Sequence, residues 1–211
     1  MMVIFSFLFQ ILEMAFASRF PAFRRWHREG FGYLLVHILY SLTFLLTALY
    51  FARTDSIASF IDASGLRKKP SDYVWFGIFF AVLLRMGSHF IITKTGMKTP
   101  WVNSHALFKH AIGAEKLFYA APILLAAFLE EPFMRGFLYK AFRGSYPIWT
   151  SIALMVVFNA VTHLIYLRSL FATFTLSCLT IMVCYLREKS GGLWDCILCH
   201  LTFNGISLLF F

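Results

Sequence analysis

Long apolar runs recur along almost the whole chain, and they limit what it can fold into more than any other feature. A helix needs about 20 mostly apolar residues to cross a bilayer. The runs are continuous and do not alternate with polar residues, so they indicate helices and not barrel strands. The predicted fold class is therefore all-α, a polytopic membrane helix bundle of about seven transmembrane helices. The expected helices are about 1–17, 31–52, 73–93, 117–139, 148–167, 169–186 and 193–211.

The composition excludes a soluble globular domain and a disordered chain. Of the 211 residues, 60% are hydrophobic and 14% are charged, against about 25% charged in ordinary soluble domains. A soluble domain of this size has too little interior to hide that much apolar surface. We therefore expect an integral, multi-pass membrane protein, in the cell (inner) membrane if the source is prokaryotic.

The first apolar run has two interpretations. Ala15-Phe16-Ala17 resembles the small-residue cleavage site of a signal peptide. However, the run lacks a basic start, and Glu13 interrupts its apolar stretch. We expect residues 1–17 to be retained as a helix.

The charged residues concentrate in the connections between the runs. The chain has 19 Lys and Arg against 10 Asp and Glu, which gives a net charge of +9. Basic residues in short loops meet anionic lipid head groups, and no nucleic-acid-binding motif is present, so the bilayer is the expected partner and nucleic acid is not. Four cysteines lie in or beside apolar runs, which favours packing residues over disulfides. They are Cys178, Cys184, Cys196 and Cys199.

Ionisable residues inside the apolar runs are costly in a membrane and usually functional. Glu131 and Arg135 are four residues apart, so they share a helix face and can form an ion pair that lowers the cost of burial. Glu130 points about 100° away around the helix. It is therefore the carboxylate left for another task, and a carboxylate in an apolar environment can serve as a general base.

Three further pairs have the same spacing of four residues. His200 and Asn204 lie one turn apart, and an imidazole and an amide aimed at one point can hold a developing oxyanion. Asn159 and His163 repeat the spacing on another run, where the histidine could share a water molecule with Glu130. The third pair is Arg85 and His89, for which we expect a structural contact.

Together these motifs resemble the CAAX-protease and bacteriocin-processing (CPBP, or Abi) family of intramembrane proteases. The Glu-Glu-x-x-x-Arg motif of that family is matched by Glu130, Glu131 and Arg135, and its His-x-x-x-Asn motif by His200 and Asn204. A Gly-Gly-Leu-Trp opening of familiar type, residues 191–194, precedes the second motif. The resemblance covers residues 115–211, a CPBP-like catalytic helix bundle, whereas residues 1–114 match only as N-terminal transmembrane helices and loops of one continuous membrane domain.

One position departs from the family pattern. The family has a Phe-x-x-x-His motif on the helix after the glutamates, and His163 is its histidine here, but Asn159 stands in place of the phenylalanine. Phe158 is one place out. We expect the change to affect substrate packing more than chemistry, and the hypothesis is that the Asn159 amide hydrogen-bonds His163 and fixes its tautomer.

The resemblance implies an enzyme, an endopeptidase that hydrolyses a peptide bond of a membrane-associated peptide or protein with a glutamate-activated water. It implies that Glu130 is the general base and that His163 helps to hold the water. His200 and Asn204 would stabilise the oxyanion. Glu131, Arg135 and Asn159 would be supporting residues.

A zinc-dependent reaction is also compatible with these residues. Family members have been called metalloproteases as well, and Glu130, His163 and His200 could be three zinc ligands with an open water position. Because no His-x-x-x-His pair preforms such a site, we expect no metal and no other cofactor. Two non-proteolytic functions stay open too: a non-catalytic membrane protein of the same fold, such as an immunity or scaffold factor, and a small transporter.

Overall fold

The computed structural model of the chain describes residues 19–20, 22, 30–52, 57–97, 99, 108–163 and 169–210. Every regular element within these ranges is helical, which confirms the predicted all-α class. The elements are α3 (Gly30–Ala52), α4 (Ile57–Ser64), α5 (Tyr73–Thr95), α7 (Glu115–Glu131), the π-helix η1 (Pro132–Leu138), α8 (Tyr139–Ser145), α9 (Ile148–Thr162), α10 (Leu170–Ser190) and α11 (Trp194–Phe210). The predicted helix at 1–17 lies outside the described residues.

The helix predicted at 117–139 is part of a longer, interrupted element. Helical backbone continues from Glu115 to Ser145, and its middle section is the π-helix. Pro132 begins that section, and it has no backbone N–H for the usual bond to the carbonyl four residues earlier. Short π segments of this kind are frequent at functional sites. Here the segment directly follows the two glutamates.

Three other predicted segments need correction. The connection 53–72 contains a short helix, α4. The helix predicted at 148–167 ends at Thr162, and His163 follows it with φ −116° and ψ 49°, outside helical geometry. In contrast, α10 runs four residues past the predicted end at 186, until Gly191 takes a left-handed conformation with φ 62° that glycine adopts without strain.

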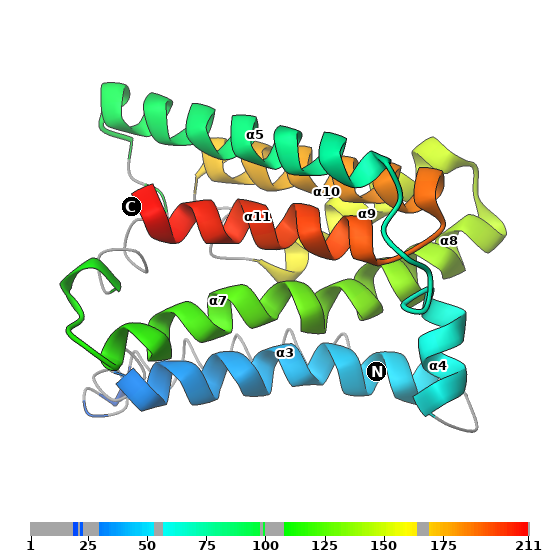
Figure 1. Ribbon diagram of the computed structural model, residues 1–211, viewed down its shortest axis with the longest axis horizontal. Helices are drawn as coiled ribbons and strands as arrows, with labels where there is room; N and C mark the ends of the chain where they lie inside the picture. Colours follow the sequence, from blue (N-terminus) through cyan, green and yellow to red (C-terminus); the bar gives the residue numbers. More distant parts are fainter. Residues whose placement is uncertain are drawn as a thin grey trace.

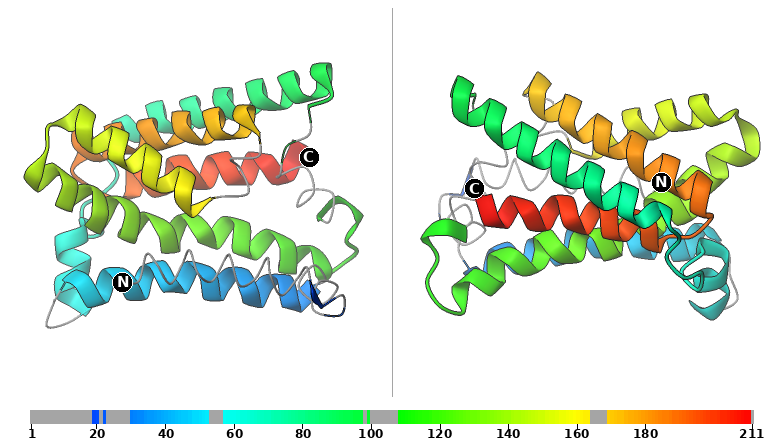
Figure 2. Two further views of the ribbon diagram at one scale, coloured as in Figure 1. Left: turned by 180° about the vertical axis from the view of Figure 1, so that it is seen from behind. Right: turned by 45° about the horizontal axis from the view of Figure 1, so that its top comes forward.

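The helix α11 lies in the middle of the bundle. It packs against α5, α7 and α10, while α3 lies along the other side of α7 (Figure 1). The views in Figure 2 show α9 alongside α10, away from α3. The last helix is therefore surrounded by α5, α7 and α10.

Two apolar clusters hold this arrangement together. The first joins η1, α8, α9 and α10 through Phe133, Met134, Tyr139, Ile152, Met155 and Cys184. The second joins α5, α10 and α11 through Ala81, Leu179, Val183, Leu186, Cys196, Cys199 and Phe203. Cys184, Cys196 and Cys199 are buried in these clusters, as expected for packing residues, and all four cysteines are free thiols.

The outward faces of the bundle are apolar. Trp75 on α5 is 71% exposed and Leu170 at the start of α10 is 89% exposed, positions suited to lipid and not to water. Within the described residues, three helical segments are long and apolar enough to cross a membrane: Tyr73–Thr95, Glu115–Ser145 and Leu170–Ser190. The protein is thus an integral membrane protein by helix length and composition, and the predicted count of about seven spans is not confirmed.

A hydrogen-bonded clamp fixes the beginning of α11. The buried carboxylate of Asp195 accepts bonds from the backbone N–H of Ser71, at 3.0 Å, and from the Ser71 hydroxyl, also at 3.0 Å. The indole N–H of Trp194 donates to the carbonyl of Leu66 at 2.8 Å. The connection between α4 and α5 therefore holds the end of the helix that carries His200 and Asn204.

Candidate active site

The C-terminal end of α7 buries two adjacent carboxylates. Glu131 has no exposed surface and Glu130 is 7% exposed. Only the first two and the last two residues of α7 are charged. The turns before the two glutamates are therefore apolar, and they pack among the neighbouring helices together with the glutamates. Burying charges in this way is unfavourable unless they are paired or have a chemical task.

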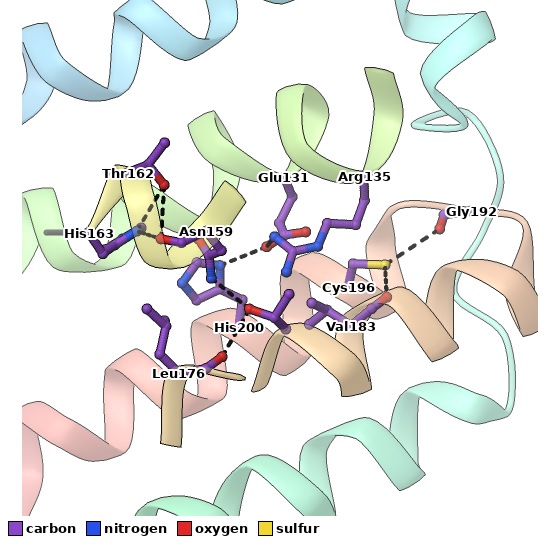
Figure 3. A network of polar contacts seen from close by, with 11 residues as sticks. Glu131, Arg135, Asn159, Thr162, His163, Leu176, Val183, Gly192, Cys196 and His200 are labelled. Atoms are coloured by element: carbon purple, nitrogen blue, oxygen red, sulfur yellow. Dashed lines mark hydrogen bonds and ion pairs between the residues drawn. The ribbon is translucent and has the colours of Figure 1, made fainter. Parts of the chain in front are cut away.

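Glu131 is the paired one of the two. Its Oε1 accepts from Nη1 of Arg135 at 3.1 Å and from Nδ1 of His200 at 2.8 Å (Figure 3). The predicted ion pair on one helix face is thus present. Because an ionised carboxylate only accepts, Nδ1 of His200 carries a proton, and Nε2 is the acceptor whenever the ring is neutral.

Glu130 lies beside this network without entering it. Its carboxylate makes no hydrogen bond or ion pair with any other residue in the part of the chain that the structure describes. Instead it lines a cavity. The prediction that Glu130 is the free carboxylate of the pair therefore agrees with the contacts.

The same cavity collects residues from four helical elements and from the end of α9. Its volume, measured for the centre of a water-sized sphere, is about 20 Å³. Since roughly 10–15 Å³ on that measure holds one water molecule, the cavity has room for a water and not for a peptide. It is lined by Glu130, Glu131, Arg135, Asn159, His163, Leu176, Leu179, Thr180 and His200.

His163 is held by the end of its own helix. Its Nδ1 lies 3.0 Å from the backbone carbonyl oxygen of Asn159, so it donates to that oxygen and fixes the tautomer of a neutral ring. The hydroxyl of Thr162 donates to the same carbonyl at 3.1 Å. The tautomer is thus set by the backbone of Asn159 and not by its side-chain amide, which corrects the hypothesis made from the sequence.

The Asn159 amide is directed to another helix. Its Nδ2 donates to Oγ1 of Thr180 on α10 at 2.6 Å, and both side chains are buried. The neighbouring Phe158 packs its ring 6.0 Å from that of Phe133, measured between centroids. The carboxamide of Asn159 therefore forms part of the cavity wall, and the ring of Phe158 lies in the adjoining apolar cluster.

Asn204, Arg85 and His89 lie outside the cavity lining. Asn204 is one turn beyond His200 on α11, as predicted, but its Nδ2 donates to the carbonyl of Ile123 on α7 at 2.8 Å. Arg85 on α5 is fully buried, with its guanidinium carbon 5.0 Å from the centroid of the Phe203 ring. That cation–π contact between α5 and α11 agrees with the structural role expected for Arg85.

Sequence patterns predict no role for α10, which contributes three residues to the cavity. They are Leu176, Leu179 and Thr180. Only Thr180 carries a signal that could have been recognised, because a buried hydroxyl in an apolar helix needs hydrogen-bond partners. The two leucines cannot be distinguished from ordinary core residues.

The arrangement of the histidines and carboxylates bears on the zinc-dependent reaction. Among the described residues, no three His, Cys, Asp or Glu side chains lie together in a way that could hold a metal ion. Glu130, His163 and His200 line one cavity, yet they do not form a ligand set in this arrangement.

A comparison with protein families identifies the C-terminal part of the chain. Residues 113–206, a little under half of the chain, match the family described as type II CAAX prenyl endopeptidase Rce1-like. The matched family is the CPBP family. The resemblance noted in the motifs is thus confirmed over residues 113–206. No curated protein and no solved structure matches the chain.

Proposed function

We propose that this protein is an intramembrane endopeptidase in which Glu130 activates a water molecule to hydrolyse a peptide bond. One observation carries the proposal: an unpaired buried carboxylate lines a water-sized cavity together with two histidines of fixed orientation. A general base must lie close to the proton that it removes. A cavity of this size keeps a water molecule within reach of Glu130.

The chemical steps follow from the positions of these groups. Glu130 takes one proton from the water, and the water oxygen forms a bond to the carbonyl carbon of the substrate while the carbonyl π electrons move to its oxygen. The C–N bond of the resulting tetrahedral intermediate then breaks, and Glu130 returns its proton to the leaving nitrogen. His163 helps to hold the water, because its ring lines the cavity beside Glu130.

His200 and Asn204 are the proposed partners of the oxyanion. Preorganised donors of this kind are typically the largest contribution to acyl-transfer catalysis. With Nδ1 donating to Glu131, Nε2 of His200 is a second donor when both ring nitrogens carry a proton. Asn204 has two N–H groups on its amide nitrogen, and one of them is bonded to Ile123. The second N–H is the donor proposed for the oxyanion.

The expected substrate is a membrane-associated peptide or protein, with a prenylated C-terminal Cys-a-a-X segment as the first candidate from the family match. The experiment uses purified protein in liposomes with a farnesylated Cys-a-a-X peptide, an unmodified copy of it and an apolar transmembrane peptide. Mass spectrometry detects the fragments. We expect cleavage of at least one peptide by the wild type and none by Glu130→Gln. Cleavage by neither protein, although both are folded, would favour a non-catalytic membrane protein of the same fold.

The proposal also predicts that hydrolysis needs no metal ion. Prolonged treatment of the reconstituted protein with a chelator, followed by its removal, should leave the cleavage rate unchanged. A zinc-dependent enzyme would lose activity in that treatment and regain it when zinc is added back. Loss and recovery of this kind would contradict the metal-free mechanism.

A further inference from the structure

A carbonyl on α10 determines which end of the Asn159 amide faces the cavity. The hydroxyl of Thr180 donates to the backbone carbonyl oxygen of Leu176 at 2.9 Å. Since a hydroxyl has one hydrogen, Thr180 must accept in its contact with Asn159. The amide nitrogen of Asn159 therefore faces Thr180, at 2.6 Å, and the amide oxygen points elsewhere.

That oxygen, Oδ1, is an acceptor beside the water-sized cavity. Asn159 is 94% buried and lines the cavity with Glu130, and Oδ1 accepts no hydrogen bond from the described part of the chain. A buried acceptor without a partner costs about 1–3 kcal/mol unless a water or a ligand satisfies it. A water in a polar cavity typically makes about three hydrogen bonds.

We propose that Oδ1 of Asn159 is a second acceptor for the water in this cavity, and that Thr180 holds the amide in the orientation that presents it. The water then donates one hydrogen to Glu130 and the other to Asn159. A lone pair of the water oxygen therefore points away from both residues. Asn159 is a catalytic residue by this assignment because it touches the reacting water. Thr180 is a positioning residue, acting through Asn159. The kinetic part of this inference rests on the proposed function.

This role of Asn159 explains what an asparagine adds at a position where the family has phenylalanine. A phenyl ring at residue 159 offers no acceptor to a water, whereas a carboxamide offers one. The apolar place of a ring is filled by Phe158, which packs on Phe133. This chain therefore combines the aromatic packing with an added polar contact at the water.

The kinetic test compares Thr180→Val, which keeps the shape and removes the hydroxyl, with Thr180→Ser, which keeps the hydroxyl. We expect Thr180→Val to lower kcat roughly three- to tenfold with KM unchanged, the loss of one neutral hydrogen bond. Thr180→Ser should stay within about twofold of the wild type. Thr175→Val is the matched control, because Thr175 also bonds a carbonyl of α10, that of Phe171, but does not line the cavity. A packing role would reverse the order and make Thr180→Ser the worse variant.

A double-mutant cycle tests whether the two residues act as one unit. Asn159→Leu should lower kcat as much as Thr180→Val or more, and Thr180→Val should add nothing in the Asn159→Leu background. Additive losses, or full activity of Asn159→Leu, would overturn the assignment.

A structural measurement separates this inference from the proposed function. A crystal structure of the wild type in a lipid mesophase should contain an ordered water within hydrogen-bond distance of both Asn159 and Glu130, and in Thr180→Val this water should shift or vanish. A water seated there in a protein that cleaves no peptide would end the proposed function and leave the role of Asn159 in holding water intact. A wild-type cavity whose water does not touch Asn159 overturns the inference, whatever the activity.

Discussion

Glu131 connects the elements of the site through a single carboxylate. One of its oxygens accepts from Arg135 and from His200, so the same group joins η1 to α11 and sets the tautomer of a histidine. Breaking a buried pair by removing one partner costs more than the pair itself contributes, because the remaining charge is left without compensation. The two members of this pair should therefore be sensitive to substitution in a way that surface pairs are not.

Arg135→Met tests this sensitivity. We expect it to lower the free energy of unfolding by about 3–5 kcal/mol, measured as the shift of the thermal midpoint in detergent. The matched control is Arg143→Met, since Arg143 pairs with Glu188 at the surface with 33% of its side chain exposed. Water and salt screen such a pair, so its loss should move the midpoint far less. Equal effects of the two substitutions would contradict a buried, functional charge network.

Sequence spacing predicted the charged part of the site better than its neutral part. The four-residue spacing of Glu131 and Arg135 correctly predicted their ion pair, because a helical face determines which side chains meet. The same spacing wrongly predicted a side-chain contact between Asn159 and His163, since the helix ends between them and the contact runs through a backbone carbonyl. Thr180 escaped notice because its partner lies on another helix, at a distance that no local pattern encodes.

At the scale of elements, the position of α11 decides the geometry of the site. It carries His200 and Asn204, and it is fixed at its beginning by the clamp from Ser71 to Asp195. The sequence predicted a helix there but not the clamp, because the two residues lie more than 120 positions apart. The sequence also did not predict the π-helix. Pro132, which begins it, is visible in the sequence, but the extent of the π-helix depends on packing.

Asp195→Ala should loosen this clamp. Hydrogen bonds to a charged group contribute about 1.5–3 kcal/mol, so we expect a loss of about 2 kcal/mol in unfolding free energy and a lower cleavage rate. Asp72→Ala, at an exposed carboxylate one residue from Ser71, is the control and should change neither quantity. A wild-type stability for Asp195→Ala would show that the contacts with Ser71 do not hold α11.

For the whole molecule, the recurring apolar runs predicted the helical class correctly, while the number of spans could not be derived from them. An apolar run in the sequence does not show how long its helix is: α9 is largely apolar but has only 15 residues. α9 packs against α10 with one side and leaves Trp149 and Val157 on its other side exposed. This is why the predicted count of seven is not confirmed, although the membrane assignment itself is supported.

The membrane assignment predicts the behaviour of the protein in cell fractions. After alkaline carbonate extraction the protein should remain in the membrane pellet, because helices that cross the bilayer are not released by high pH or by loss of surface charge contacts. A peripheral protein that was expressed alongside it would serve as the control and should appear in the supernatant. Release of this protein with the control would contradict the assignment.

The claim on which the account depends is that Glu130 is the general base, and the single-turnover cleavage rate of Glu130→Gln in liposomes tests it most directly. Glutamine keeps the size of the side chain and removes its basicity, and general-base catalysis contributes roughly 10²–10⁴-fold. We predict a rate at least about 100-fold below that of the wild type, with an unchanged thermal midpoint. A folded Glu130→Gln variant that cleaves at the wild-type rate would contradict the account.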